Sequence, residues 1–197
     1  MHNAEIEWLR RAQQGEDAAF SRLVEVYQKP VYNLCYRMLG NAGDAEDAAQ
    51  ETFIRAYKAI KRYDPSRKFS TWLLTIASNY CIDQHRRRKL PTFSVDEFEN
   101  PDIPEKAPGM EARLVQNEHQ QQIAELLDEL KPKDRSAVIM RYWYDYSYEE
   151  ISEALSLSVS AVKSRLHRAR KTLAEVWSET QYEAVSIERK QYETSAI

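Results

Sequence analysis

Apolar side chains recur at helical spacing in two separate blocks of this chain, and this pattern constrains the fold more than any other feature. The first block runs from Phe20 to Cys81 and the second from Ile123 to Leu173. Such spacing predicts amphipathic α-helices, and no stretch alternates convincingly as a β-strand would. Only four of the 197 residues are glycine, which suits a helical chain. We therefore expect an all-α protein.

A stretch with little apolar periodicity separates the two blocks. Residues 90–117 contain four prolines and several acidic side chains, a composition typical of a linker. We expect a small helical domain at 15–89, a flexible acidic linker at 90–117, a second helical domain at 118–176 and a tail of unknown role at 177–197. Because the linker cannot bury enough apolar surface to order itself, the two domains are expected to move independently in the free protein.

Local signals set the expected helix boundaries in the first domain. Gly40 ends one helical run, and an amphipathic helix is expected at about residues 44–61. Asp64-Pro65-Ser66 is a sequence typical of a turn. Ser70 can cap a further helix over about residues 71–88.

The composition argues against several classes of protein. No run of about 18 apolar residues exists, so no membrane insertion is expected, and the N-terminus lacks the features of a signal peptide. Cys35 and Cys81 lie in apolar-periodic stretches, so we expect two buried thiols in a reducing cytoplasm. The four histidines are scattered and no Cys-x-x-Cys is present, so we expect no structural zinc and no cofactor.

Charges are segregated along the chain although the net charge is only −3. Residues 55–89 carry ten Lys or Arg against two acids, and residues 158–173 carry five bases and no acid. Acidic stretches at 41–54 and 90–118 flank the first basic block. Two basic blocks separated by acidic ones predict two nucleic-acid surfaces on one chain.

Residues 147–170 have the most informative local pattern. Ser147 and Glu150 have the spacing of a capping box, and Ser158 can cap a second helix after a short turn at 156–158. On that second helix one apolar stripe is formed by Val162, Leu166, Ala169 and Leu173. A short helix, a tight turn and a second helix predict a helix-turn-helix.

The side of this second helix opposite the stripe is polar and basic. It presents Ser164, His167, Arg168 and Lys171, flanked by Lys163, Arg165 and Arg170. Such a face offers donors to phosphate oxygens and guanine edges. The alternative is an ordinary amphipathic helix with a solvated basic face.

The residues from Asp44 to Arg88 closely resemble region 2 of the extracytoplasmic-function (ECF) sigma factors of the sigma-70 family. The run from Lys29 to Asn41 looks like the start of the same region, and the helix-turn-helix resembles region 4. The sequence motifs RMLGN and RKFSTWL are most similar to those of the sigma-W type. The resemblance implies a stress-response transcription initiation factor, not an enzyme, which binds core RNA polymerase and reads the −10 and −35 promoter elements.

In region 2 the resemblance implies a polymerase-docking face. Asp47, Gln50 and Glu51 match the family's docking motif, and their spacing puts them on one side of a helix. In the family this face meets the clamp helices of the polymerase β′ subunit. Without the resemblance, the same residues would be interpreted as a solvated acidic face near a helix N-terminus.

The resemblance also assigns −10 recognition to residues 63–70 and the helix that follows. A flipped base needs an aromatic or polar pocket, and a separated strand needs cations along its backbone. Tyr63 and Phe69 could line the pocket, Asn79 matches a position near the captured base, and Trp72 is expected in the core. The cations expected along the strand are Arg67, Lys68, Arg86, Arg87, Arg88 and Lys89. Residues 86–89 could also simply offset the helix dipole.

In region 4 the resemblance implies −35 recognition. Ser164, His167 and Arg168 match the positions that read bases, with Lys163, Arg165, Arg170 and Lys171 nearer the backbone. The chain departs from the family at the turn, where it has Ser156 in place of a glycine and Ser158-Val159-Ser160-Ala161-Val162 in place of Pro-Val-Gly-Thr-Val. Further partners implied are the polymerase β flap, through region 4, and an anti-sigma factor, which in this family can be membrane-anchored.

Two other classes share some of these features. A helix-turn-helix repressor or response regulator would use the same second domain, but a phosphoreceiver domain alternates strands with helices. A nuclease could hold a metal ion with Asp44, Glu46, Asp47 and Glu51, but these acids lie on an alanine-rich helix without a partner histidine or a glycine-rich phosphate loop.

Overall fold

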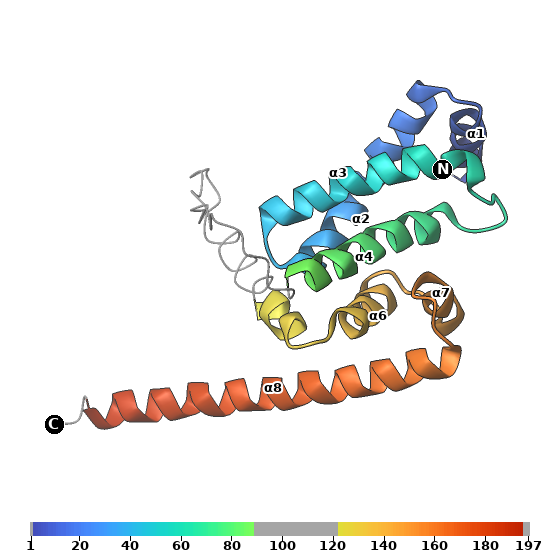
Figure 1. Cartoon of the computed structure of the whole chain (residues 1–197). Coiled ribbons are helices and arrows are strands. Elements are labelled where there is room, and N and C mark those ends of the chain that lie inside the picture. The colour runs from blue at the N-terminus through green and yellow to red at the C-terminus, as the bar shows by residue number, and fades with distance from the viewer. Residues whose placement is uncertain (1, 89–121, 195–197) are drawn as a thin grey trace, which may run out of the picture.

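The computed structural model describes residues 2–88 and 122–194, and within these ranges every regular element is a helix (Figure 1). The all-α prediction is therefore confirmed. The N-terminal domain consists of α1 (His2–Gln13), α2 (Asp17–Leu39), α3 (Ala42–Ala59), the short 3-10 helix η1 (Ile60–Arg62) and α4 (Phe69–Arg88). The C-terminal domain consists of a helical segment at 122–128, α6 (Pro132–Trp143), α7 (Tyr148–Ala154) and α8 (Val159–Thr194). The expected linker at 90–117 lies outside the described residues.

Helices α2, α3 and α4 form the N-terminal core, and α1 packs against α2 and η1. Helix α3 can approach α2 closely because its buried side is made of small residues: Ala45, Ala48, Ala49, Thr52 and Ala56. Gly40 ends α2 with a left-handed backbone (φ 81°), and the Asn41 side chain then caps α3 by accepting from the Asp44 amide at 2.8 Å. The two cysteines are buried free thiols, as expected.

The start of α4 differs from the expected one. The helix begins at Phe69, because the Lys68 carbonyl already accepts a helical hydrogen bond from the Trp72 amide at 3.2 Å. Ser70 therefore lies inside the first turn, and its expected role as the N-cap is wrong.

The C-terminal domain contains the expected helix-turn-helix, formed by α7 and α8. Ser147 and Glu150 make both hydrogen bonds of a capping box, and the Ser158 hydroxyl accepts from the Ala161 amide at 3.2 Å. Val162, Leu166 and Ala169 are buried, as the apolar stripe predicted. Helix α8 continues to Thr194, so residues assigned to a tail from 177 extend the recognition helix.

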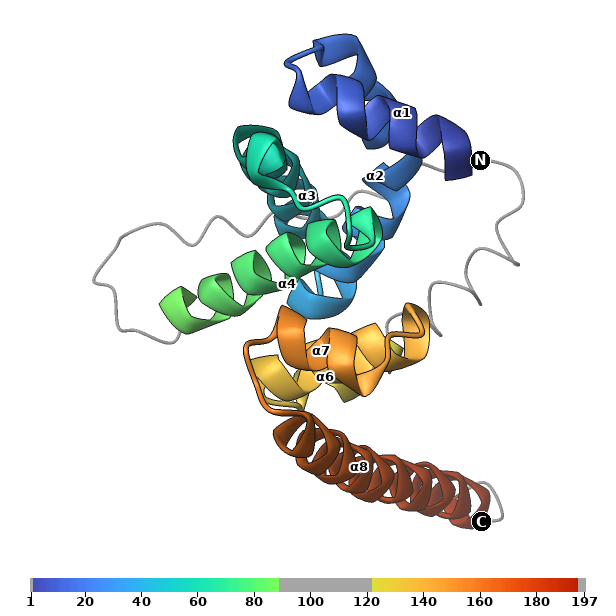
Figure 2. The same ribbon diagram turned by 90° about the vertical axis from the view of Figure 1, so that its right-hand side faces the viewer.

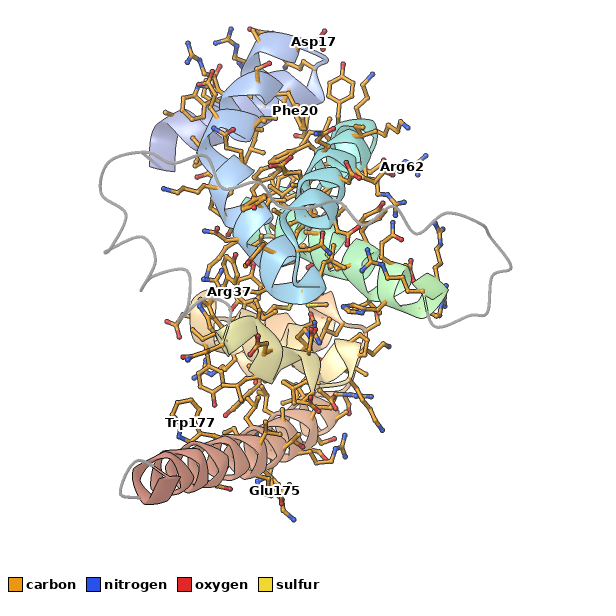
Figure 3. The ribbon with its side chains drawn as sticks, turned by 90° about the vertical axis from the view of Figure 1, so that its left-hand side faces the viewer. Asp17, Phe20, Arg37, Arg62, Glu175 and Trp177 are labelled. Atoms are coloured by element: carbon orange, nitrogen blue, oxygen red, sulfur yellow. The ribbon has the colours of Figure 1, made fainter. Side chains whose placement is uncertain are left out.

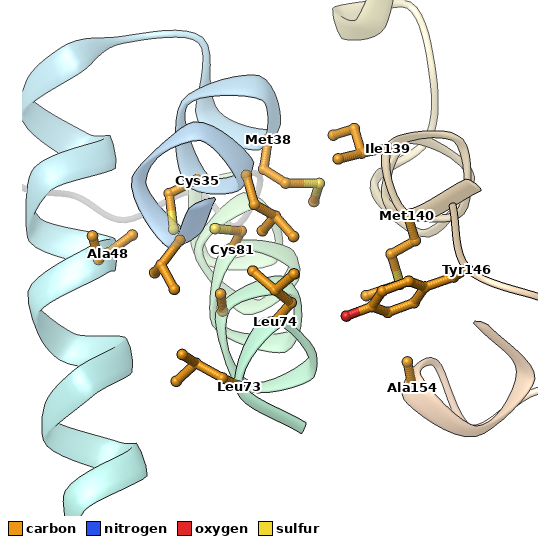
Figure 4. Close-up of a cluster of buried hydrophobic side chains, with 14 of the residues drawn as sticks. Cys35, Met38, Ala48, Leu73, Leu74, Cys81, Ile139, Met140, Tyr146 and Ala154 are labelled. Carbon is orange, nitrogen blue, oxygen red and sulfur yellow. The ribbon is translucent and has the colours of Figure 1, made fainter. Parts of the chain in front are cut away.

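The two domains are packed against each other, which differs from the expectation that they move independently. Helices α6 and α7 lie between the N-terminal domain and α8 (Figures 1 and 2), and they contact α2 and α4. The apolar cores of the two domains are continuous, with Met38 and Leu74 on one side and Met140 and Tyr146 on the other (Figure 4). Sequence alone could not predict this contact, because it depends on how two distant surfaces fit together.

Polar groups inside this interface add specific contacts. Arg135 on α6 is 2% exposed. Its Nη1 donates to the Met38 carbonyl at 2.7 Å, and its Nη2 lies 2.5 Å from Asp128 Oδ1. The Ser78 hydroxyl on α4 is hydrogen-bonded to that of Ser136 on α6. These bonds fix how the two domains sit relative to each other.

Aromatic side chains close the same interface at the middle of α2. The Tyr144 hydroxyl donates to the Pro30 carbonyl at 2.6 Å. The Arg37 guanidinium lies 5.0 Å from the centre of the Trp143 ring, and Figure 3 shows Arg37 on the side of α2 that faces the C-terminal domain. Burial lowers the pKa of Arg37 and raises the pKa of the Tyr144 hydroxyl.

The interface also contains a buried polar atom without a hydrogen-bond partner among the described residues, Arg135 Nε. The buried hydroxyls of Thr71 and Tyr146 face each other across it. An unsatisfied buried polar group costs about 1–3 kcal/mol. Interfaces between domains of one chain are more polar than permanent ones and are commonly separable. The contact is therefore specific, and the unpaired Arg135 Nε reduces its stability.

A wedge between α4 and α6 should open this interface. Ser136→Trp places an indole where Ser78 and Ser136 meet, both at most 1% exposed. Overpacking typically costs about 1–3 kcal/mol, so we expect the domains to separate while each keeps its helices. Small-angle X-ray scattering should show a larger radius of gyration with an unchanged circular dichroism spectrum. Ser21→Trp, at an exposed position on α2, is the control. An unchanged radius of gyration in Ser136→Trp would contradict the described packing.

Candidate polymerase and nucleic-acid interfaces

The exposed side of α3 carries the three residues expected to dock on polymerase. Asp47 and Gln50 are exposed, and Glu51 is partly exposed and pairs with Arg55 at 2.7 Å. They face outward because the opposite, alanine-rich side of α3 is buried against the core. The described helices of the C-terminal domain pack on α2 and α4, and α4 lies between them and α3 (Figures 1 and 2).

A cleft of about 530 Å³ that was not predicted from the sequence adjoins this face. It lies between α2 and α3, and Gln50 is part of its wall. The other residues that line it are Val24, Gln28, Lys29, Tyr32, Glu46, Ala49 and Phe53. The α2 members recur at one-turn spacing, which was a detectable signal. A partner helix lying along α3 could insert an apolar side chain between Tyr32 and Phe53.

Asp44 belongs to the structure of the domain and not to the docking face. Its carboxylate is bonded to Arg88, at the end of α4, and to the Asn41 amide. Burial opposes ionisation, but these hydrogen bonds outweigh it and lower the pKa of Asp44. Arg88, expected to follow DNA phosphates, thus ties α4 to α3. Arg86, at 3.4 Å from Asp83, and Arg87 are exposed, as is half of the Arg88 side chain. Lys89 lies outside the described residues.

The two aromatic residues expected to form a base pocket are buried in the structure. Tyr63 is 4% and Phe69 3% exposed, and their rings pack against each other and against Trp72. The Tyr63 hydroxyl donates to the Arg67 carbonyl, and Gln13 of α1 donates to the Tyr63 carbonyl at 2.8 Å. The aromatic cluster of Tyr63, Phe69 and Trp72 therefore packs beneath the loop, on its buried side. Burying the large rings of Tyr63 and Phe69 is more favourable than exposing them to solvent.

The exposed side of the same loop carries Arg67 and Lys68, and both face carboxylates from the other domain. Arg67 Nη2 lies 2.5 Å from Glu153 Oε1, and Lys68 Nζ lies 3.2 Å from Glu150 Oε1. A cavity of about 350 Å³ separates the loop and the start of α4 from α7. Asn79 on α4 is exposed. The contact of these two acids with the loop was not predicted from the sequence, whose pattern indicated only the capping role of Glu150.

Glu150 is held in its ionised form. The backbone amide of Ser147 lowers the pKa of this carboxyl, partial burial opposes the shift, and the bond from Lys68 lowers the pKa further. A single carboxylate therefore closes the capping box of α7 and reaches the loop of the N-terminal domain.

Helix α8 presents the expected recognition face to solvent. Ser164, His167, Arg168 and Lys171 are exposed, and α8 lies on the far side of α6 and α7 from the N-terminal domain (Figures 1 and 2). Arg168 Nη1 donates to Ser164 Oγ at 3.1 Å, which orients the guanidinium along the helix. This surface is open to a DNA groove in the packed state.

Two of the three flanking basic residues, Arg165 and Lys163, contact other parts of the domain. Arg165 Nη1 lies 2.6 Å from Asp134 Oδ1 on α6, and Asp134 is buried. Lys163 lies over the Tyr148 ring, 5.5 Å from its centre. Arg170 is exposed and borders an apolar hollow of about 320 Å³, which is also lined by Ile123, Leu126, Leu127, Val138, Tyr142, Trp143 and Leu173. Arg165 therefore has a structural role in addition to any contact with DNA.

The chain matches two family models in order along its length. The model of sigma-70 region 2 matches residues 23–90, and that of sigma-70 region 4 matches residues 120–173. A helical region 2 followed by a region 4 helix-turn-helix defines a transcription initiation factor of the sigma-70 class.

The relatives narrow this class. The chain is 38% identical over 179 residues to the ECF RNA polymerase sigma factor SigW of Bacillus subtilis, covering 84% of this chain and 92% of the relative. It is 35% identical over 162 residues to the ECF RNA polymerase sigma factor SigE of Mycolicibacterium smegmatis, covering 81% of this chain and 63% of that one. The chain belongs to the ECF RNA polymerase sigma factors. The N-terminal and C-terminal domains are accordingly its region 2 and region 4 domains.

A solved structure agrees with this assignment. CnrH, in complex with the cytosolic domain of CnrY, is 26% identical to this chain with a TM-score of 0.67, covering 89% of this chain and 98% of CnrH. Among the described residues, no helix has the length and apolar character needed to cross a membrane.

The contact between Arg165 and Asp134 predicts that Arg165 matters for stability and Arg168 does not. Arg165→Ala leaves the buried carboxylate of Asp134 without its partner, which should lower the free energy of unfolding by about 1–3 kcal/mol. Arg168→Ala, three residues later on the exposed face, should change it by less than about 0.5 kcal/mol. Urea unfolding followed by circular dichroism measures both, and equal stabilities would contradict the structural role of Arg165.

Proposed function

We propose that this protein confers promoter specificity on core RNA polymerase and catalyses no reaction itself. In this role it binds the polymerase in the cytoplasm, and its two domains read the −10 and −35 elements. The observation that carries the proposal is the match to region 2 and region 4, in order, on a chain whose two basic surfaces belong to those regions.

In the proposed docking mode, the α3 face formed by Asp47, Gln50 and Glu51 meets the clamp helices of the β′ subunit. Exposure of this face supports this mode, as does the packing of the described region 4 helices on α2 and α4. The neighbouring cleft can receive an apolar side chain while the acids pair with basic side chains of the partner. An apolar contact beside a charged one is the usual anatomy of a specific interface.

For the −10 element we propose that a single DNA strand follows the loop at 63–70 and the exposed side of α4. Arg67, Lys68, Arg86 and Arg87 would contact phosphates, and Asn79 would lie near a base. Tyr63 and Phe69 would act from beneath, by holding the loop in shape. Arg88 would contribute mainly through its bond to Asp44.

For the −35 element we propose that α8 enters a major groove. Arg168, His167 and Ser164 would reach base edges, while Lys171 and Lys163 would contact phosphates. Exposure of these side chains opposite a buried stripe supports this arrangement.

Region 4 carries a further surface suited to protein partners. The apolar hollow beside α6 and α8 includes Trp143 at 39% and Tyr142 at 56% exposure, and such exposed aromatic residues are typical of protein interfaces. We assign this surface to the polymerase β flap. We also propose control by an anti-sigma factor, since CnrH is known in complex with the cytosolic domain of CnrY.

Charge reversal on α3 tests the docking face. Glu51→Lys should weaken binding to core polymerase at least fivefold, because a repulsive charge enters the contact. Glu7→Lys is a matched control, since Glu7 also forms an exposed ion pair along its own helix, with Arg10. Titration of labelled protein with core polymerase measures both affinities. Equal affinities would assign docking to another surface.

Base and phosphate contacts on α8 can be separated by their sequence dependence. A bidentate contact to guanine contributes about 1–3 kcal/mol of discrimination. Arg168→Ala should therefore lower transcription from a mapped promoter roughly tenfold and flatten the penalty for mutating one −35 base pair. Lys171→Ala should weaken all promoters more evenly.

The measurement for this prediction is run-off transcription with both variants on a set of single-base −35 mutants at fixed salt. If Arg168→Ala keeps the base preferences of the parent protein, base reading belongs to another residue of the same face. His167 and Ser164 are then the next to test.

A further inference from the structure

The ion pairs between the −10 loop and α7 suggest a function beyond holding the domains together. Arg67 and Lys68 are the cations of that loop proposed to contact promoter DNA, and in the structure both are paired with carboxylates of the helix-turn-helix. Each carboxylate takes the place that a phosphate oxygen of a DNA strand would take, because both are anionic acceptors for the same donors.

We propose that α7 is an internal cover for the −10 loop, in which Glu150 and Glu153 hold Lys68 and Arg67 and exclude a DNA strand until region 4 moves away. This inference rests on the proposed −10 role of the loop. The covering segment belongs to the chain itself, since α7 packs on α4, the helix that directly follows the loop.

The geometry makes the cover selective. Helix α7 faces the loop across the cavity lined by Ser66, Thr71, Thr75 and Ala154, so a strand entering there would bring its phosphates next to two carboxylates. Helix α8 lies on the other side of α7, and its recognition face stays open. The packed state therefore blocks −10 binding and leaves −35 binding available.

The contact has the properties of a cover that can be removed. Both ion pairs are solvent-accessible, with side-chain exposures of 53% and 50% for Arg67 and Glu153 and of 76% and 25% for Lys68 and Glu150. Arg67 also has an alternative partner in its own loop, Asp64 at 3.9 Å. Exposed pairs are weak and sensitive to salt, so polymerase binding and promoter phosphates can displace them.

Neutralising both carboxylates tests the cover directly. Glu150→Gln keeps the capping box, because glutamine also serves at that position, and Glu153→Gln changes one exposed group. The double variant should bind a fluorescent single-stranded DNA of mixed sequence about three- to tenfold more tightly than the parent protein, by anisotropy at low salt. Glu129→Gln with Glu149→Gln is the control, since both residues are exposed in the same domain and the pair has the same net charge but removes no contact to the loop.

The wedge Ser136→Trp provides a second measurement. In that background the cover is already displaced, so Glu150→Gln with Glu153→Gln should add no further gain. If the double variant and its control bind DNA equally in the parent background, the cover is refuted. An equal gain in the wedge background would also refute it, since a general charge effect would then explain the gain.

A separate pair of substitutions tests whether the loop binds DNA at all. Arg67→Ala with Lys68→Ala in the wedge background should weaken binding of the same DNA at least threefold. If it does not, the loop is not the DNA surface, whatever the carboxylate variants do. The two failures are therefore distinguishable within one set of titrations.

Discussion

A buried arginine, Arg135, fixes the relative orientation of the region 2 and region 4 domains. Arg135 reaches from α6 to the carbonyl of Met38 near the end of α2, where His85 of α4 also binds at 2.6 Å. Three helices thus converge on one carbonyl oxygen. Burial lowers the pKa of Arg135, and Asp128 opposes the shift. Removing such a cation from water is favourable only with these partners in place, so the guanidinium specifies one arrangement of the domains.

In that arrangement the protein cannot contact both promoter elements at the same time. The −10 and −35 elements are centred about 25 base pairs apart, which is about 85 Å of duplex. Region 2 and region 4 are in direct contact, and α7 faces the loop proposed to hold the −10 strand. The protein must therefore open to reach both elements. Its polar interface, with the buried Arg135 Nε lacking a partner among the described residues, makes opening feasible.

Local chemistry made much of the fold predictable. The capping box at Ser147, the Ser158 cap and the Gly40 stop each depend on a few neighbouring residues, and all three are present. The exposed α3 and α8 faces followed from helical periodicity. Burial of Tyr63, the pairing of Arg165 with Asp134 and the pairing of Arg67 with Glu153 did not follow, because each depends on residues distant in sequence. Ion pairs across a domain interface leave no periodic signature.

The distance between the two regions tests this account most directly. A donor and an acceptor dye at Arg62→Cys and Glu175→Cys, both exposed sites (Figure 3), report the separation of region 2 from α8, and the native thiols are buried and protected. We predict one state of high transfer efficiency in the free protein and a low-efficiency state after addition of core polymerase and promoter DNA. Equal efficiency in both, or a broad low-efficiency distribution in the free protein, would contradict the account.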